Sequence, residues 1–88
     1  TFCVCLSETK PLRYIAGQFD RVHLFPQSKR AVIYDFKTSR EAALTPAYAR
    51  QMRDYRTALM HLTGFPEAAI RMVLLFTRSG RVVEVPDA

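Results

Sequence analysis

Two aspartates and a lysine, Asp20, Asp35 and Lys37, are the residues of this sequence whose types and spacing could do chemistry together. Carboxylates that share a partly buried site repel each other, and a divalent cation between them would remove the conflict. Asp35 and Lys37 are two residues apart, so the period of a strand would place the acid and the amine on one face. The sequence therefore predicts a metal site formed by the two aspartates, with Lys37 placed to act beside it.

A β-hairpin is the element that must bring the aspartates together. Residues 14–25 and 31–38 are each predicted to form a strand, and the polar residues between them favour a turn. We expect Phe25 to pair with Arg30, which aligns opposed side chains on one face with Cβ atoms roughly 5 Å apart. The further opposed pairs in this register are Leu24 with Ala31, Val22 with Ile33, Asp20 with Asp35, and Gln18 with Lys37. The apolar pairs would thus lead directly into the acidic pair.

Alternation along the strands also allows a second interpretation, in which Asp20 and Asp35 lie at solvated strand ends. Each would then pair with a neighbouring cation such as Arg21 or Arg40, because charged strand residues are mostly exposed. The face that the aspartates share with the apolar pairs of the hairpin favours the metal site, and so does the spacing of Asp35 and Lys37.

One amphipathic helix is predicted from Thr45, as N-cap, to about Leu62. Pro46 suits the first helical position, and Gly64 stops the helix. One face is expected to carry Tyr48, Gln51, Met52, Tyr55, Leu59 and Leu62, and the other face Arg50, Arg53, Asp54 and Arg56. A glutamine and a tyrosine four residues apart on the sheet-facing side are either ordinary packing or orienters of a lysine, a bound water or a phosphate.

Shorter segments complete the predicted order. Residues 2–6 are expected to form a strand, 7–11 a polar turn, 38–44 a loop, and 70–78 and 82–85 two further strands. Gly17 interrupts the strand predicted ahead of the hairpin turn, which indicates a bulge or a close backbone approach just before Asp20. The order β-β-β-α-β-β predicts an α/β or α+β domain in which the helix covers one face of the sheet.

Composition limits the chain to one modest unit. The 88 residues carry a net charge of +5, and 49% of them are hydrophobic, which suffices for one small core. A pI near 9.7 favours a polyanionic partner, although a small basic excess also serves solubility alone. No segment reaches transmembrane length or resembles a signal peptide.

Cys3 and Cys5 are expected to be free thiols, in agreement with a reducing, cytoplasmic location. Because the sequence starts at Thr1 within an apolar stretch, we expect residues 1–88 to be a single domain of a longer polypeptide.

Three motifs in order resemble a known family. The run Gly17-Gln18-Phe19-Asp20-Arg21-Val22 resembles G-x-(I/F)-D-R-(V/L), Asp35-Phe36-Lys37-Thr38 resembles D-(Y/F)-K-T, and Gln51-x-x-x-Tyr55 resembles Q-x-x-x-Y. These motifs are typical of the nuclease domain of RecBCD- and AddAB-type helicase–nucleases, a branch of the PD-(D/E)xK nuclease superfamily. Each motif alone is weak, but three in the right order are specific, and the resemblance covers nearly the whole chain.

The resemblance implies a core with a mixed sheet flanked by helices and a deoxyribonuclease activity that depends on Mg²⁺ or Mn²⁺. Asp20 and Asp35 would hold the metal, with the Phe36 carbonyl as a further oxygen ligand. Lys37 would position or help to activate the attacking water. A lysine beside a metal can do this, since it can also stabilise the charge that develops on the phosphate.

Gln51 and Tyr55 would, by the same resemblance, organise the site or the DNA beside it. Glu8 is a looser match to a glutamate that the family carries ahead of its first motif. The family also has an upstream helix with a histidine at the metal site; this sequence starts after that point, which puts the activity of the fragment alone in question. Such enzymes act in DNA repair and recombination, as exonuclease V does, so the implied partners are DNA and a helicase motor in the same chain or in a partner subunit.

Arginines near the expected site could contact DNA. Arg40, Arg50 and Arg53 are candidates for phosphate contacts, and solvated surface is the alternative. The competing interpretation of the whole chain is a non-catalytic DNA-binding or subunit-interaction module that has kept the nuclease fold. The intact set of Asp20 and Asp35 with Lys37 favours the nuclease, because a degenerate site would be expected to lose one of them.

Overall fold

The computed structural model describes residues 2–5 and 14–86. The strands are β1 (Phe2–Cys5), β2 (Tyr14–Gly17), β3 (Arg21–Phe25), β4 (Arg30–Lys37), β5 (Ile70–Phe76) and β6 (Arg81–Val85), and the helix α1 (Pro46–Thr63) lies between β4 and β5. Single 3-10 turns occupy Pro26–Ser28 and Glu67–Ala69. The predicted turn at residues 7–11 and the candidate Glu8 lie outside the described residues.

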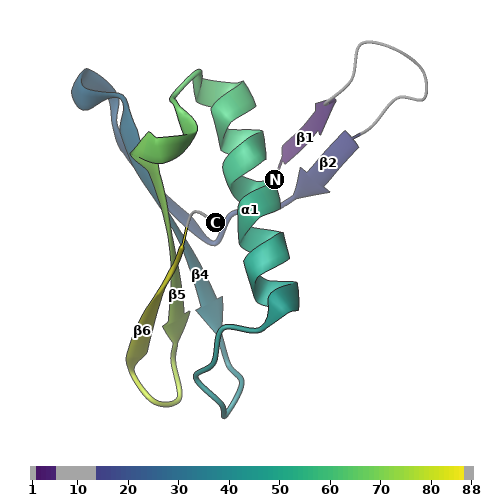
Figure 1. The fold of residues 1–88 in the computed structure, drawn as a ribbon, viewed down its shortest axis with the longest axis vertical. Helices are drawn as coiled ribbons and strands as arrows, with labels where there is room; N and C mark the ends of the chain where they lie inside the picture. The colour runs from purple at the N-terminus through teal and green to yellow at the C-terminus, as the bar shows by residue number, and fades with distance from the viewer. Residues whose placement is uncertain (1, 6–13, 87–88) are drawn as a thin grey trace.

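A mixed four-stranded sheet forms the centre of the fold, in the order β3-β4-β5-β6. The β3–β4 and β5–β6 pairs are antiparallel, and β4 and β5 are parallel because α1 provides the crossover between them. Figure 1 shows α1 lying along one face of this sheet. The expected α/β architecture, with a mixed sheet covered by a helix, is therefore confirmed.

A second, two-stranded sheet pairs β1 with β2 and lies against α1. In Figure 1 it stands on the side of α1 away from the four-stranded sheet. The prediction of one continuous strand over residues 14–25 is wrong, because the chain leaves one sheet after Gly17 and enters the other at Arg21. The observed order thus has four strands before the helix in place of three, and the break falls at residues 18–20, directly before the site.

The hairpin register is confirmed over the apolar part of the ladder. Phe25 faces Arg30, and the pairs Leu24–Ala31 and Val22–Ile33 follow. The ladder ends at Arg21 and Tyr34, so the predicted strand pairings of Asp20 with Asp35 and of Gln18 with Lys37 are wrong. Asp20 instead lies in a bend, where its side chain substitutes for the missing strand partner: Oδ2 accepts a hydrogen bond from the Phe36 N–H at 2.9 Å.

The limits of α1 match those expected. Thr45 caps the helix by accepting a hydrogen bond from the Tyr48 N–H at 3.1 Å, and Pro46 occupies the first turn. Gly64 ends the helix in a left-handed conformation with φ 77°, which glycine adopts without steric cost, and its N–H donates to the Met60 carbonyl at 2.8 Å.

The hydrophobic core lies between α1 and the sheet. Its fully buried members include Met52 from the helix together with Ile33, Met72, Leu74 and Phe76 from the strands. Two residues depart from the predicted helix faces. Leu62, expected in the core, is 58% exposed, and Arg56, expected in solvent, is 5% exposed. Arg56 is buried because the 3-10 turn after the helix supplies Glu67, whose Oε1 lies 2.9 Å from its Nη2. Within residues 2–5 and 14–86, no helix has the length and apolar character needed to cross a bilayer.

Candidate active site

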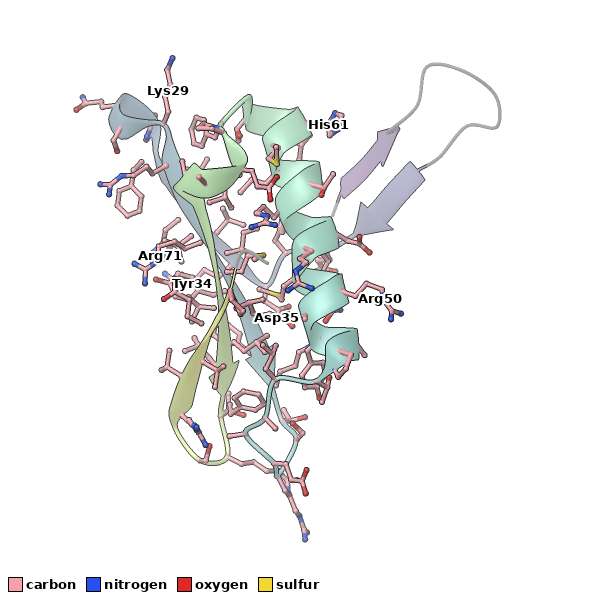
Figure 2. The ribbon with its side chains drawn as sticks, viewed as in Figure 1. Lys29, Tyr34, Asp35, Arg50, His61 and Arg71 are labelled. Atoms are coloured by element: carbon pink, nitrogen blue, oxygen red, sulfur yellow. The ribbon has the colours of Figure 1, made fainter. Side chains whose placement is uncertain are left out.

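Asp35 is the buried centre of the candidate site. The side chains of β4 alternate, so Ala31, Ile33 and Asp35 all point toward α1 and are buried. Asp35 is 5% exposed, and Figure 2 shows it between the sheet and the helix. A carboxyl group thus continues the row of apolar side chains on the core face, where a charge is unfavourable without a partner.

Asp20 meets Asp35 from the bend ahead of β3. The two carboxyl groups interact, and each shifts the pKa of the other. Asp20 is exposed, and it is held in place by its hydrogen bond from the Phe36 N–H. The structure therefore brings together the two acids named from the sequence, although by a bend and a side-chain hydrogen bond and not by the ladder.

The pKa values of the two carboxyl groups are shifted in opposite directions. Burial raises the pKa of Asp35, and the hydrogen bond with Asp20 raises it further, against the opposing effect of Lys37. The same hydrogen bond, followed by that from the Phe36 N–H, lowers the pKa of Asp20. Two acids in contact share one proton more readily than they carry two charges. The pair is thus a site of concentrated negative charge that favours a cation.

Lys37 lies beside this pair on the same strand face. Its Nζ is 2.6 Å from Asp35 Oδ2 and donates a hydrogen bond to Gln51 Oε1 at 2.8 Å. The ammonium also lies 4.4 Å from the centre of the Tyr48 ring. The position expected for α1 is confirmed here, because its glutamine reaches the lysine of β4.

Tyr55 extends this chain of contacts along α1. Gln51 Nε2 donates to the Tyr55 hydroxyl at 3.0 Å, so the amide is oriented at both ends. The Phe19 ring packs edge-on against Tyr55, with ring centres 5.6 Å apart. Burial, and then the nearby charge of Asp35, raise the pKa of Tyr55. The hydroxyl therefore stays protonated near neutral pH.

The donor set can be tested for its fit to a divalent metal. Asp35 Oδ2 is buried and accepts no hydrogen bond from any described residue; Lys37 approaches it closely, but without hydrogen-bond geometry. The described residues contain no group of three or more His, Cys, Asp and Glu side chains suited to a metal. Mg²⁺ commonly takes only one or two carboxylates and fills its remaining positions with water and phosphate oxygens. Two acids, one of them with an unmatched oxygen, fit that pattern.

The Phe36 carbonyl points to the same edge as Asp20. In an antiparallel ladder the N–H and C=O of one residue face the same neighbour. The Phe36 N–H faces Asp20, whereas the Lys37 carbonyl faces β5 and accepts from the Thr77 N–H at 3.0 Å. The Phe36 oxygen therefore lies on the Asp20 side of β4, beyond the end of the ladder, where the proposed third oxygen ligand is needed.

Comparison with known protein families gives a match over almost the whole chain. The family model of the PD-(D/E)XK nuclease superfamily matches residues 3–87. The chain belongs to the PD-(D/E)XK nuclease superfamily. No curated protein and no solved structure matches it. The superfamily name describes part of the pattern found here: two acids, of which the second, Asp35, is followed two residues later by Lys37.

The three arginines proposed for DNA contact differ in their exposure. Arg40 lies exposed in the loop after β4, and Arg53 is partly buried on α1. Figure 2 shows Arg50 pointing outward from α1, away from Asp35. Their role in DNA binding stays a prediction.

Two aromatic residues contribute to the PD-(D/E)XK site in ways that the sequence does not reveal. Spacing places Tyr48 on the apolar helix face but does not predict its contact with Lys37. Phe19 is part of the first sequence motif, but its packing on Tyr55 is seen only in the folded structure. A signal for Tyr48 is present in its position three residues before Gln51, which places both on one helix face.

Proposed function

We propose that this chain is the nuclease domain of a RecBCD- or AddAB-type helicase–nuclease and hydrolyses phosphodiester bonds in DNA with Mg²⁺ or Mn²⁺. The observation that carries the proposal is the buried Asp35 carboxyl, which lies against a second acid and a lysine and keeps an oxygen without a hydrogen-bond partner. A buried acid that shares its site with a second acid and a lysine has a perturbed pKa, and perturbed acids of this kind gather at functional sites.

Each residue of the site has a role in this proposal. Asp20, Asp35 and the Phe36 carbonyl would hold the metal, which when bound activates water and neutralises charge on the phosphate. Lys37 would donate a hydrogen bond to the attacking water or to a phosphate oxygen. Gln51 holds the ammonium at its Oε1, and the Tyr55 hydroxyl fixes the amide that does so. Such positioning lowers the barrier because the lysine need not reorganise during the reaction.

The wider context belongs to the same proposal. The motif order supports a domain within a longer cytoplasmic polypeptide that works in DNA repair or recombination, with a helicase motor in the same chain or in a partner subunit. The net charge of +5 is consistent with DNA as the partner, with Arg40, Arg50 and Arg53 contacting phosphates.

The test is cleavage of end-labelled linear DNA by the intact protein with Mg²⁺, with Mn²⁺ and with EDTA. We expect metal-dependent cleavage that Lys37→Ala abolishes while DNA binding persists. Binding of Mn²⁺, followed by its electron paramagnetic resonance signal, should weaken in Asp35→Asn and not in the matched control Asp54→Asn, whose carboxyl lies exposed on α1. Cleavage by Lys37→Ala at the wild-type rate would contradict the proposal and favour a non-catalytic DNA-binding module.

A further inference from the structure

The Tyr48 ring differs in kind from the other contacts that the structure describes for Lys37. The ammonium lies 4.4 Å from the ring centre, within the range in which a cation is attracted to the negative face of an aromatic ring. The other two contacts, Asp35 Oδ2 and Gln51 Oε1, are oxygen atoms of an acid and an amide. The lysine is thus held between an acid, an amide and a ring.

Tyr48 is well placed to act as a fixed support. Its backbone N–H donates to the Thr45 cap, which ties the residue to the start of α1. The ring packs against the buried Phe76, with ring centres 6.4 Å apart, and the hydroxyl lies 3.5 Å from Ser39 Oγ in the loop after β4. Backbone, ring and hydroxyl are therefore each anchored to a different element, so the ring face presented to Lys37 has little freedom to turn.

We propose that Tyr48 is a positioning residue for Lys37, acting through the face of its ring. The inference rests on the proposed function, in which Lys37 assists attack on the phosphate. An aromatic face attracts the ammonium without offering a lone pair that competes with water or phosphate for its N–H groups. Asp35 and Gln51 cannot do this, because each approaches the ammonium with an oxygen atom. The ring would keep the lysine in the site while its hydrogen bonds change during turnover.

The first experiment compares replacements at position 48 in the intact protein. Tyr48→Leu keeps the apolar packing on Phe76 but removes the ring, and Tyr48→Phe keeps the ring but removes the hydroxyl. We expect Tyr48→Leu to lower kcat by about 3- to 30-fold, the range given by a cation–π contact at a partly buried site. The KM for DNA should change little, and Tyr48→Phe should restore most of the rate. The matched control Tyr34→Leu, on the sheet face away from α1, should cleave as the wild type does.

The second experiment observes the contact without cleavage. In the intact protein with labelled lysine, the side-chain NMR signals of Lys37 can be assigned as those that disappear in Lys37→Arg. The ring current of Tyr48 should shift the Lys37 methylene signals upfield in the wild type and in Tyr48→Phe. The shift should be absent in Tyr48→Leu and unchanged in Tyr34→Leu.

The outcomes separate this inference from the proposed function. If Lys37→Ala loses cleavage while Tyr48→Leu keeps the wild-type rate, Tyr48 is not a positioning residue, although the nuclease assignment stands. If Tyr48→Phe is as slow as Tyr48→Leu, the hydroxyl and its Ser39 contact matter and the ring mechanism is wrong. If Lys37→Ala cleaves normally, the nuclease proposal is wrong, and the inference is overturned with it.

Discussion

The buried ionic side chains Asp35, on β4, and Arg56, on α1, differ in the charged groups that they contact. Asp35 and Arg56 are each 5% exposed. Arg56 points from α1 to one acid, Glu67, at 2.9 Å, and that partner is 57% exposed at its side chain. Asp35 forms an ion pair with Lys37, whose Nζ lies 2.6 Å from its Oδ2, but it also lies against a second acid, Asp20. Equal burial thus conceals a difference in charge environment: Arg56 contacts an opposite charge, whereas Asp35 contacts both an opposite charge and a like charge.

The difference indicates which of the two serves the fold. Arg56 meets an opposite charge, which links α1 to the turn after it. Two acids in contact cost stability, because like charges in a poorly solvated place repel. Such a cluster persists in a small domain where it has a use, and perturbed acids gather at functional sites for that reason. We therefore propose that Asp35 serves function and that Arg56 serves the fold.

Substitution of Asp35 should reduce cleavage strongly without lowering stability. This effect should be larger than that of any substitution at Arg56. In Asp35→Asn the side chain keeps its size but loses its charge. Cleavage should fall by about a thousandfold or more, since several kcal/mol of transition-state stabilisation are lost with the metal. The free energy of unfolding of the metal-free protein at neutral pH should stay the same or rise. Cleavage assays and urea denaturation with EDTA measure the two quantities.

The double variant sharpens this result. Lys37→Ala should be as inactive as Asp35→Asn, and the combination should be no worse than either, because both disable one transition state. Additive losses would show that Asp35 and Lys37 act in separate steps. A large drop in stability in Asp35→Asn would mean that the acid serves the fold, and the contrast with Arg56 would disappear.

Substitution in the Arg56–Glu67 ion pair should lower stability and leave cleavage unchanged, and this effect should be smaller. Glu67→Gln removes the partner charge and leaves Arg56 buried. We expect the free energy of unfolding to fall by about 1–3 kcal/mol, less than for a fully buried pair because Glu67 is largely exposed. Cleavage under conditions where the protein is folded should be unchanged. The matched control is Glu41→Gln, an exposed acid in the loop after β4. A loss of cleavage without a loss of stability would contradict the structural role of the pair.

The contrast also shows what the sequence could predict. The hairpin register followed from alternation and a polar turn, and the limits of α1 followed from Thr45 and Gly64, because these signals are local. The pairing of the D-x-K strand with a helix that carries Gln51 also followed from a few nearby motifs. Fold class and the proximity of Lys37 to Gln51 were therefore accessible.

The features that escaped prediction depend on contacts made far along the chain. The break between β2 and β3 depends on which sheet each half joins, and alternation continues through it unchanged. The burial of Arg56 depends on Glu67, eleven positions later and beyond the end of the helix. Tyr48 carries the same periodic signal whether it packs in the core or supports Lys37. The charge of Arg56 predicted that its side chain would be exposed to solvent, and only the folded structure shows its contact with Glu67.

The smallest expected effect is the pH dependence of stability in the metal-free protein. Asp35 has a pKa raised above the ordinary aspartate value of 3.8, so the folded protein retains a proton that the unfolded chain has released. Stability from this group is complete below 3.8 and falls as the pH rises through the raised pKa. Asp20 has a lowered pKa, so its contribution is present above 3.8 and is lost as the pH falls through the lowered pKa. The acidic pair should therefore be most favourable near 3.8.

Urea denaturation with EDTA across the acidic to neutral range measures this profile, and comparison with variants isolates the pair. In Asp35→Asn the decline of stability above 3.8 should flatten, because the group that gains a charge there is gone. The control Asp54→Asn should keep the wild-type profile, since that acid is exposed. An unchanged decline in Asp35→Asn would show that the acids at this site titrate independently, and the conflict that distinguishes Asp35 from Arg56 would then not exist.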